Sequence, residues 1–366
     1  MAFAFIKHDT KIDFIGKRHI AYVLSILLIL VGLGSALWGN GLRMGIDFAG
    51  GVIVQVQFAQ PVEDELLKKS LDIPELPGIS TQRFGEGARN YLLRFSSAED
   101  TDAATLRTTV LSALAKAFPG NDVDIQRLEM VGPKVGDDLT NKALGALYYA
   151  TLLIAVYISG RFEQRWMAGV AMAAVLWGGM YLAGLTGLGM GWLVLMALVI
   201  TMVVCFVLKL NFALGALVGL IHDVSITVGL LSIMDVEIDL NVMAALLTLV
   251  GYSLNDTIIV YDRLRENLRA APKQPLASLI NCSVNQTLSR TILTSGTTFV
   301  ATLSLYLLGG GVIHDFALTM LIGVFVGTAS SIYVSSAVLL ALGDTAFYVH
   351  QQERPVYEKP GEHGIV

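Results

Sequence analysis

Residues 251–267, GYSLNDTIIVYDRLREN, place an acid inside a sequence that is otherwise suited to lipid. They follow the apolar run 240–250, LNVMAALLTLV, and the first cluster of aqueous charges comes only at Asp262 and Arg263. Asp256 therefore lies six residues, or roughly 9 Å of helix, inside that end. An ionised and unpaired carboxylate costs several kcal/mol there, so Asp256 must be paired, hydrated or protonated. Intramembrane acids are functional sites by default; a carboxylate that only holds helices together is the alternative.

Polar neighbours accompany Asp256 along this helix. Tyr252 lies one turn earlier, Ser253 lies three residues earlier, and Asn255 is adjacent. Residues three and four apart share a helix face, so Tyr252 and Ser253 are expected to line one stripe with Asp256. We predict a site around Asp256 that these three residues support.

The composition is that of a multi-pass membrane protein. The chain has 366 residues, of which 54% are hydrophobic and 15% charged, and its mean hydropathy is +0.63. The net charge of −5 says little, because the charges are confined to loops and one soluble block. Cys205 lies in an apolar run and Cys282 in a polar segment, so both are expected to be free thiols.

The first 141 residues predict one membrane helix and one soluble domain. Residues 1–19 are basic, and the apolar run 20–38 is long enough to span a bilayer as an uncleaved helix. Residues 39–141 are polar and have the element order βαββαβ of a ferredoxin-like α+β sandwich. They contain no histidine, cysteine or nucleotide-binding loop. The expected elements are a strand after the glycine pair in 45–58, a helix in 61–71, strands in 78–84 and 90–96, a helix in 101–120 that starts near Thr101, and a strand in 122–131.

The remainder predicts a bundle over 142–342 and a cytoplasmic tail over 343–366. With the first helix, about eight spans are expected; the other seven are 143–159, 166–187, 190–208, 212–232, 240–261, 290–308 and 316–342. Alternate loops are rich in Lys and Arg, whereas the loops GLGMG, MDVEID and GGGVIHD contain neither. This positive-inside pattern predicts that both termini are cytoplasmic and the soluble domain is external.

Residues 264–289 predict an amphipathic segment along the cytoplasmic face, broken by Pro272 and Pro275. It leads to Arg290 at the mouth of the next span. That span begins with several hydroxyl residues, including Thr294. The hydroxyl groups either donate to carbonyls of their own helix or line a hydrated pathway through the membrane. Arg290 is either a functional residue or an anchor whose side chain extends to the membrane surface.

Small residues recur every four positions in two other spans. They are Gly215 and Gly219 in one span and Gly323 and Gly327 in the other, and such stripes let helices approach closely. Asp223 continues the first stripe and so should point into a helix interface. With His222 it forms either a packing pair or a fragment of a proton relay.

Four stretches together resemble the SecF family of bacterial protein export, within the RND superfamily. They are GIDFAGG at 45–51, the stretch 251–267, SRTILTSGTT at 289–298, and GGGVIHDFALTMLIGVFVGTASSIYV at 309–334. Two departures stand out. Ala49 occupies a position where the family usually has Thr, and a family stretch RFEWRFALGA is divided into RFEQR at 161–165 and NFALGA at 211–216. The apolar insert between them predicts an extra helix pair at about 166–208.

The resemblance implies a six-helix RND-type half-bundle in the bacterial inner membrane, with no cofactor. It implies SecD as the partner half, with YajC, the SecYEG channel and the SecA motor as further partners. It also implies that a gradient of H⁺ or Na⁺ drives late steps of preprotein export, with Asp256 and Arg290 as the coupling pair. In the external domain it implies a family motif made by Gly45, Asp47, Phe48, Gly50 and Gly51.

Three other functions are compatible with parts of the sequence. An RND-type exporter of lipids or small molecules would share the buried acid. However, a single small external domain provides little surface to enclose a substrate pathway. An intramembrane aspartyl protease would use Asp223 and Asp256, but antiparallel helices need not bring these acids to one depth. A passive scaffold would show no dependence on an ion gradient.

Overall fold

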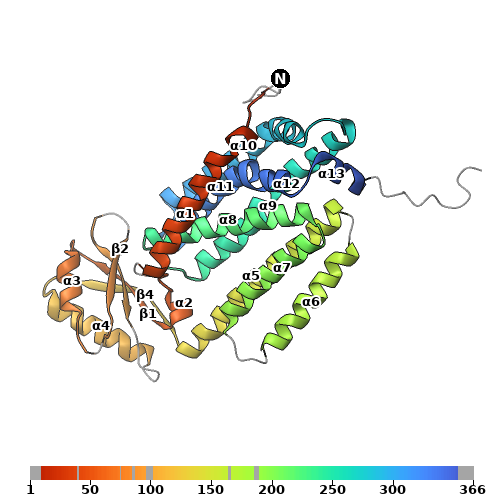
Figure 1. Ribbon diagram of the computed structural model, residues 1–366. Helices are drawn as coiled ribbons and strands as arrows, with labels where there is room; N and C mark the ends of the chain where they lie inside the picture. Colours follow the sequence, from red (N-terminus) through yellow and green to blue (C-terminus); the bar gives the residue numbers. More distant parts are fainter. Residues whose placement is uncertain are drawn as a thin grey trace, which may run out of the picture.

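The protein consists of a helical bundle with a small α+β domain at one end (Figure 1). This computed structural model describes residues 10–38, 41–74, 76–84, 87–95, 102–163, 166–184 and 189–352. Several predicted features lie outside the described residues: Lys7 of the basic N-terminus, the helix start at Thr101, the last two residues of RFEQR and the end of the tail.

The α+β domain has its elements in the predicted order and a four-stranded antiparallel sheet of order β2-β3-β1-β4. Every second residue of β1 is buried, because successive side chains of a strand point to opposite faces. That buried face packs against the two helices through Leu67 of α3 and Leu106, Val110 and Leu114 of α4. The elements are β1 (Gly51–Phe58), α3 (Asp64–Ser70), β2 (Ser80–Phe84), β3 (Asn90–Phe95), α4 (Ala103–Ala117) and β4 (Val123–Val131).

Six described helical stretches are long and apolar enough to cross a membrane, rather than the eight expected. They are Ile15–Trp38, Pro133–Phe162, Asn211–Ile233, Leu240–Ala270, Leu276–Leu308 and Ile313–Leu342. These stretches contain the helices α1 (Arg18–Trp38), α5 (Pro133–Glu163), α8 (Asn211–Ile233), α9 (Leu240–Ala270), α10 (Leu276–Leu308) and α11 (Gly311–Ser330). The last stretch continues through a π-helix, η2 (Ser331–Ser335), into α12 (Ser336–Leu342). The predicted tail begins with α13 (Thr345–Gln352).

The residues predicted to be an inserted pair of helices, about 166–208, are helical. They form α6 (Trp166–Gly184) and α7 (Met190–Val207), whose described apolar stretches, Gly169–Gly178 and Gly191–Val207, are shorter than a usual span. Helix α7 packs on α5 and α8, whereas α6 packs on α5 and α7 at the edge of the bundle (Figure 1). The pair therefore lies on the α5 side of the bundle and reaches α8 through α7.

The prediction of a separate surface segment at 264–289 is wrong. Helix α9 continues to Ala270, and α10 begins at Leu276, so only a short turn containing Pro272 and Pro275 separates them. At 1.5 Å per residue these helices are about 46 and 50 Å long, whereas the hydrocarbon core is about 30 Å thick. The apolar face of this segment is covered within the protein: Leu264 and Leu268 are buried in one cluster with the start of α10. The α9–α10 hairpin therefore extends well beyond the membrane.

Candidate functional site

Asp256 lies near the middle of α9 with 1% of its surface exposed, and its hydrogen bonds come from α10. Ser295 Oγ donates to Asp256 Oδ2 at 3.0 Å, and Thr294 Oγ1 lies 3.5 Å from Oδ1. A third helix joins through Thr328 of α11, whose hydroxyl donates to Ser295 Oγ at 2.8 Å. The buried carboxylate is thus held by a short chain of hydroxyl groups across α9, α10 and α11.

Arg290 is exposed and lies one helical turn before Thr294 on α10. It forms no ion pair with Asp256, since the carboxylate's hydrogen bonds within the described chain come from Ser295 and Thr294. The two residues nevertheless lie at similar depth. Counting about 1.5 Å per residue from the Leu240 end of α9 and the Leu308 end of α10 puts them roughly 24 and 27 Å along. The role of Asp256 and Arg290 in ion coupling remains a prediction.

The residues predicted to support Asp256 separate into three environments. Tyr252 packs in an apolar cluster with α11, and its buried hydroxyl has no hydrogen-bond partner among the described residues. Asn255 is exposed. Ser253 turns away from Asp256 and donates to Asp223 on α8. Helix periodicity predicted that these residues share one face of α9. It could not predict that this face, about one third of the helix circumference, contacts more than one neighbouring helix.

Most hydroxyl residues of α10 follow the first alternative, and the hydrated pathway remains a prediction. Most bond back to the helix, as Thr298 Oγ1 does to the Thr294 carbonyl at 3.0 Å. Thr294 Oγ1 also donates to the Arg290 carbonyl at 3.0 Å. Ser295, which is buried, is the member whose hydroxyl is directed at the carboxylate.

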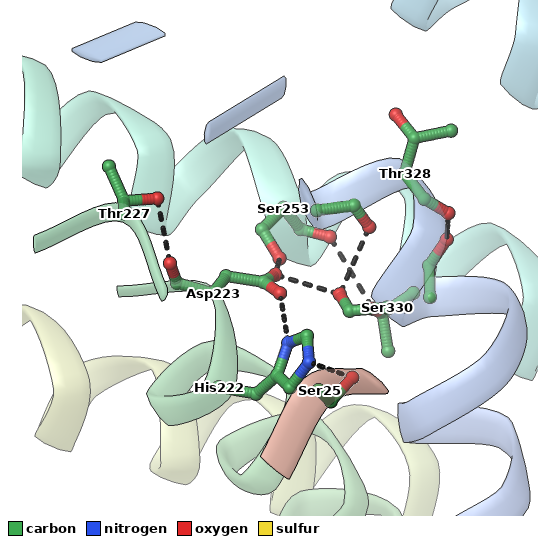
Figure 2. A network of polar contacts seen from close by, with 10 residues as sticks. Ser25, His222, Asp223, Thr227, Ser253, Thr328 and Ser330 are labelled. Atoms are coloured by element: carbon green, nitrogen blue, oxygen red, sulfur yellow. Dashed lines mark hydrogen bonds and ion pairs between the residues drawn. The ribbon is translucent and has the colours of Figure 1, made fainter. Parts of the chain in front are cut away.

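A second acid, Asp223 of α8, is the centre of a denser network (Figure 2). Its side chain is fully buried, and its Oδ2 accepts from Ser253 of α9 and, at 2.8 Å, from Ser330 of α11. Its Oδ1 lies 2.8 Å from His222 Nδ1, and His222 Nε2 lies 2.8 Å from Ser25 Oγ of α1. The structure therefore brings Asp223 into the helix interface predicted for it, where it bonds to α9 and α11 directly and is linked to α1 through His222.

The four predicted packing glycines lie at close helix contacts. A Cβ atom on Gly327 would lie 3.2 Å from Ser253 Cβ and 3.4 Å from Asp223 Oδ2. On Gly323 it would lie 2.5 Å from Leu249 Cδ1, and on Gly215 it would lie 2.5 Å from the Tyr261 hydroxyl. On Gly219 it would overlap the Ser335 hydroxyl. The absence of side chains here lets α9 and η2 approach α8 and α11.

The motif at 45–51 lies where the α+β domain joins the bundle. Its residues 46–49 form the short helix α2 (Ile46–Ala49). Gly45 N–H donates to the Ile238 carbonyl at 2.8 Å, and Asp47 Oδ2 accepts from Leu240 N–H at 3.0 Å, at the start of α9. Phe48 is buried in a cluster with α8 and α9. The motif thus attaches the domain to the loop between these helices.

The glycine pair permits the sharp change of direction into β1. Gly50 and Gly51 have φ of 72° and 133°, which side-chain-bearing residues rarely adopt. A Cβ on Gly50 would also lie 3.1 Å from Pro133 Cα at the start of α5. Gly50 therefore lies closely against the start of α5, and Gly51 begins β1.

Charged residues at the same joint were not anticipated from the sequence. Glu237, in the α8–α9 loop, forms ion pairs with Arg43 at 3.3 Å and with Arg94 of β3, and Arg43 also pairs with Asp235 at 2.6 Å. Burial lowers the pKa of Arg94 from its usual value. The loop's acidic composition was the only signal in the sequence, and the partners come from two distant segments.

Comparison with known proteins decides the family. The model described as "Protein export membrane protein SecD/SecF, C-terminal" matches residues 110–188 and 185–345, and the "SecD/SecF GG Motif" matches residues 35–62. The chain belongs to the SecD/SecF family. Its glycine-pair motif is the one that joins the α+β domain to the bundle. SecD/SecF proteins are transport proteins, which excludes the intramembrane protease.

SecF subunits of protein translocases are similar over nearly their whole length. The SecF of Calditerrivibrio nitroreducens is 36% identical over 336 residues, which cover 91% of this chain and 95% of that one. The SecF of Escherichia coli O157:H7 is 35% identical over 351 residues, which cover 95% and 93%. The crystal structure of SecDF, a translocon-associated membrane protein from Thermus thermophilus, matches with a TM-score of 0.67 and 28% identity. The match covers 92% of this chain but 39% of that longer one.

Proposed function

We propose that this chain is the SecF-type half of a gradient-driven pair in the bacterial inner membrane. With a SecD-type partner it uses an H⁺ or Na⁺ gradient to drive late steps of preprotein export, in association with SecYEG, YajC and the SecA motor. The observation that carries the proposal is Asp256, an almost fully buried carboxylate held by hydroxyls of α10 near the exposed Arg290. An acid in this position is the expected element of an ion path.

Polar residues on the outer face of α9 and α10 support a partner half at this surface. Arg290, Asn255 and Thr297 are all exposed, although they belong to membrane-spanning stretches. An Arg or Asp at the centre of a membrane helix costs about 2.5–3.5 kcal/mol, so such residues normally face protein or water. A SecD-type half would cover them. The SecDF chain, of which this one matches 39%, is long enough to contain both halves.

The energy available suits a conformational change. Moving one elementary charge through the membrane potential supplies about 2.3 kcal/mol per 100 mV. Two states of a membrane bundle that differ by a few kcal/mol can be interchanged by a few such charges. The external domain, assigned as ferredoxin-like, would then follow the bundle through the α2 joint.

The topology proposed is eight helices with both termini in the cytoplasm. The α6–α7 pair is assigned as an insertion between RFEQR and NFALGA, and an even number of added helices preserves the orientation of α8 to α11. The basic loops support this arrangement. The runner-up function, export of lipids or small molecules by an RND-type mechanism, has the same ion site and would differ in the substrate that moves.

The test is export of a preprotein in inverted membrane vesicles that contain the chain and its partners, with and without an imposed gradient. Asp256→Asn should fold, bind partners and lose the gradient-dependent part of export, because Asn is nearly isosteric but cannot titrate. Arg290→Lys should be impaired as well, because an ammonium does not reproduce the guanidinium fork.

Asp262→Asn is a matched control: it makes the same chemical change on the same helix, at a surface carboxylate that pairs with Arg161 at 3.0 Å. Its export should keep the gradient stimulation. If Asp256→Asn is stimulated as strongly as Asp262→Asn, the ion path does not include Asp256. If neither the parent protein nor any variant responds to the gradient, the chain is a passive scaffold.

A further inference from the structure

We infer that His222 and Asp223 form a second proton-binding site, separate from Asp256, in which one proton is shared between the imidazole and the carboxylate. The inference rests on the proposed function in one respect: it adds a site to the same ion path and assigns that path to H⁺. Its physical basis is the network around Asp223 (Figure 2).

Charge balance requires a proton in this pair. Asp223 is fully buried and His222 is 9% exposed. Every hydrogen bond of the carboxylate comes from a neutral serine or from His222, and no Lys or Arg of the described chain pairs with it. An isolated ionised carboxylate in such a site is very unfavourable. One proton on either Asp223 or His222 leaves the pair with no net charge.

The donor set suits a proton better than a sodium ion. A hard cation needs several oxygen ligands with free lone pairs. Here Oδ2 of Asp223 already accepts from Ser253 and Ser330, and Oδ1 faces an imidazole nitrogen. A nitrogen 2.8 Å from a carboxylate oxygen is the geometry of a proton shared in a hydrogen bond.

The proton transfer is balanced within the pair. In one form the Asp223 carboxyl donates its proton to the lone pair of His222 Nδ1, and Nε2–H donates to Ser25 Oγ. When the proton moves from Oδ1 to Nδ1, a carboxylate faces an imidazolium, and the net charge does not change. His222 Nε2–H donates to Ser25 Oγ in both forms, so the transfer redistributes charge between His222 and Asp223 while the proton stays within the pair.

The two forms differ in how firmly they hold the neighbouring helices. The carboxylate form accepts strong, charge-assisted hydrogen bonds from Ser253 on α9 and Ser330 on α11, whereas the protonated form accepts weaker ones. Ser330 is also the last residue before the π-helix η2, and π-helices are frequently found at functional sites. Ser253 lies three residues before Asp256 on α9. The position of the proton within the pair therefore acts on the two helices that also carry Asp256 and Thr328.

Other titratable groups near the pair are few. Helices α5 and α7 also pack on α8, but none of their described residues hydrogen-bonds with His222 or Asp223. Within three residues of Ser25, Ser253 and Ser330, the titratable side chains are Tyr22, Tyr252, Asp256 and Tyr333. Among these, Asp256 is the carboxylate whose signal must be separated from that of Asp223.

Infrared difference spectroscopy of the purified full chain tests the site without requiring export. The probe is H⁺ alone, with pH steps recorded at constant and then at varied Na⁺ concentration. We expect a carbonyl band of a protonated, buried carboxyl group that is lost in Asp223→Asn and kept in Asp256→Asn. In His222→Gln, which keeps the carboxyl and removes the base, the band should persist at altered frequency and with an altered pH midpoint.

Two results would overturn the inference. One is a spectrum in which Asp223→Asn and His222→Gln both match the parent protein. The other is a carbonyl change that follows Na⁺ at constant pH. His222→Gln keeps the test decisive if Asp223→Asn fails to fold, because its carboxyl remains. If the Asp223 band is present as expected but export is not stimulated by the gradient, the proposed function is refuted and the proton site at Asp223 is supported.

Discussion

Gly32 of α1 and Gly229 of α8 bring two helix backbones into direct contact, and one methyl group tests that contact. A Cβ atom on Gly32 would lie 2.6 Å from Gly229 Cα and 3.3 Å from its carbonyl carbon. Carbon atoms pack at about 3.5–4.0 Å. Since backbone atoms cannot rotate away as a side chain can, Gly32→Ala must separate the helices by roughly 1 Å.

That separation would also break two polar contacts between α1 and α8. Ser35 Oγ lies 3.1 Å from Ser232 Oγ, and Ser25 Oγ lies 2.8 Å from His222 Nε2. Adding 1 Å takes both beyond hydrogen-bonding distance. Overpacking costs about 1–3 kcal/mol and each lost hydrogen bond about 0.5–1.5 kcal/mol. We therefore expect Gly32→Ala to lower the free energy of unfolding by about 2–6 kcal/mol.

The assay is unfolding in mixed detergent micelles, with Gly34→Ala as the control. A Cβ on Gly34 would have no non-local atom within 4 Å, and Ala is the better helix former by about 1 kcal/mol. Gly34→Ala should therefore be as stable as the parent protein or slightly more so. If the two alanine variants unfold together, α1 does not pack on α8 at this contact, and the argument from backbone distance fails.

Three further changes test the joint, the topology and the insert. Asp239 Oδ1 caps α9 by accepting from Val242 N–H at 2.8 Å, so Asp239→Ala should cost about 1 kcal/mol and Asp239→Asn much less, measured as apparent Tm. Burial raises the pKa of Asp239, so the folded state binds a proton more readily than the unfolded state. As the pH falls through that pKa, the parent protein should therefore gain stability relative to Asp239→Asn. If the stabilities of the two proteins change in parallel with pH, this expectation is wrong. In a background with Cys282→Ser and Cys205→Ser, Gly189→Cys should react with an impermeant thiol reagent from outside and Gln274→Cys should not; labelling of both from one side would refute the eight-helix topology. Deleting 166–210 should preserve insertion and partner binding with at least partial export; stable insertion without binding to a SecD-type partner, scored by co-purification, would show that α6 and α7 belong to the core.

Local sequence patterns were sufficient for the order of elements in the α+β domain and for six of the eight expected spans. Alternation of buried residues in β1 and the order of strands and helices in the α+β domain could be predicted, because each depends on residues a few positions apart. The same is true of the six long apolar stretches. The acid in α9 was recognisable because a carboxylate stands out in an apolar run. Residues 264–289 were misassigned for a related reason: an amphipathic pattern predicts that one face is covered, and it is the same whether lipid or another helix covers it.

The partners of the buried acids depend on distances between helices, which no local pattern contains. Ser253 is three residues from Asp256 along α9, yet its hydroxyl bonds to Asp223, because α8 and α11 approach that side of α9 where Gly327 leaves room. Asp256 instead receives Ser295 from α10, and Arg290 remains outside hydrogen-bonding contact. Glu237 gathers Arg43 and Arg94 from segments that are far apart in the chain. Helix periodicity specifies which side of a helix a residue occupies, whereas the identity of the neighbour on that side is settled only when the helices pack.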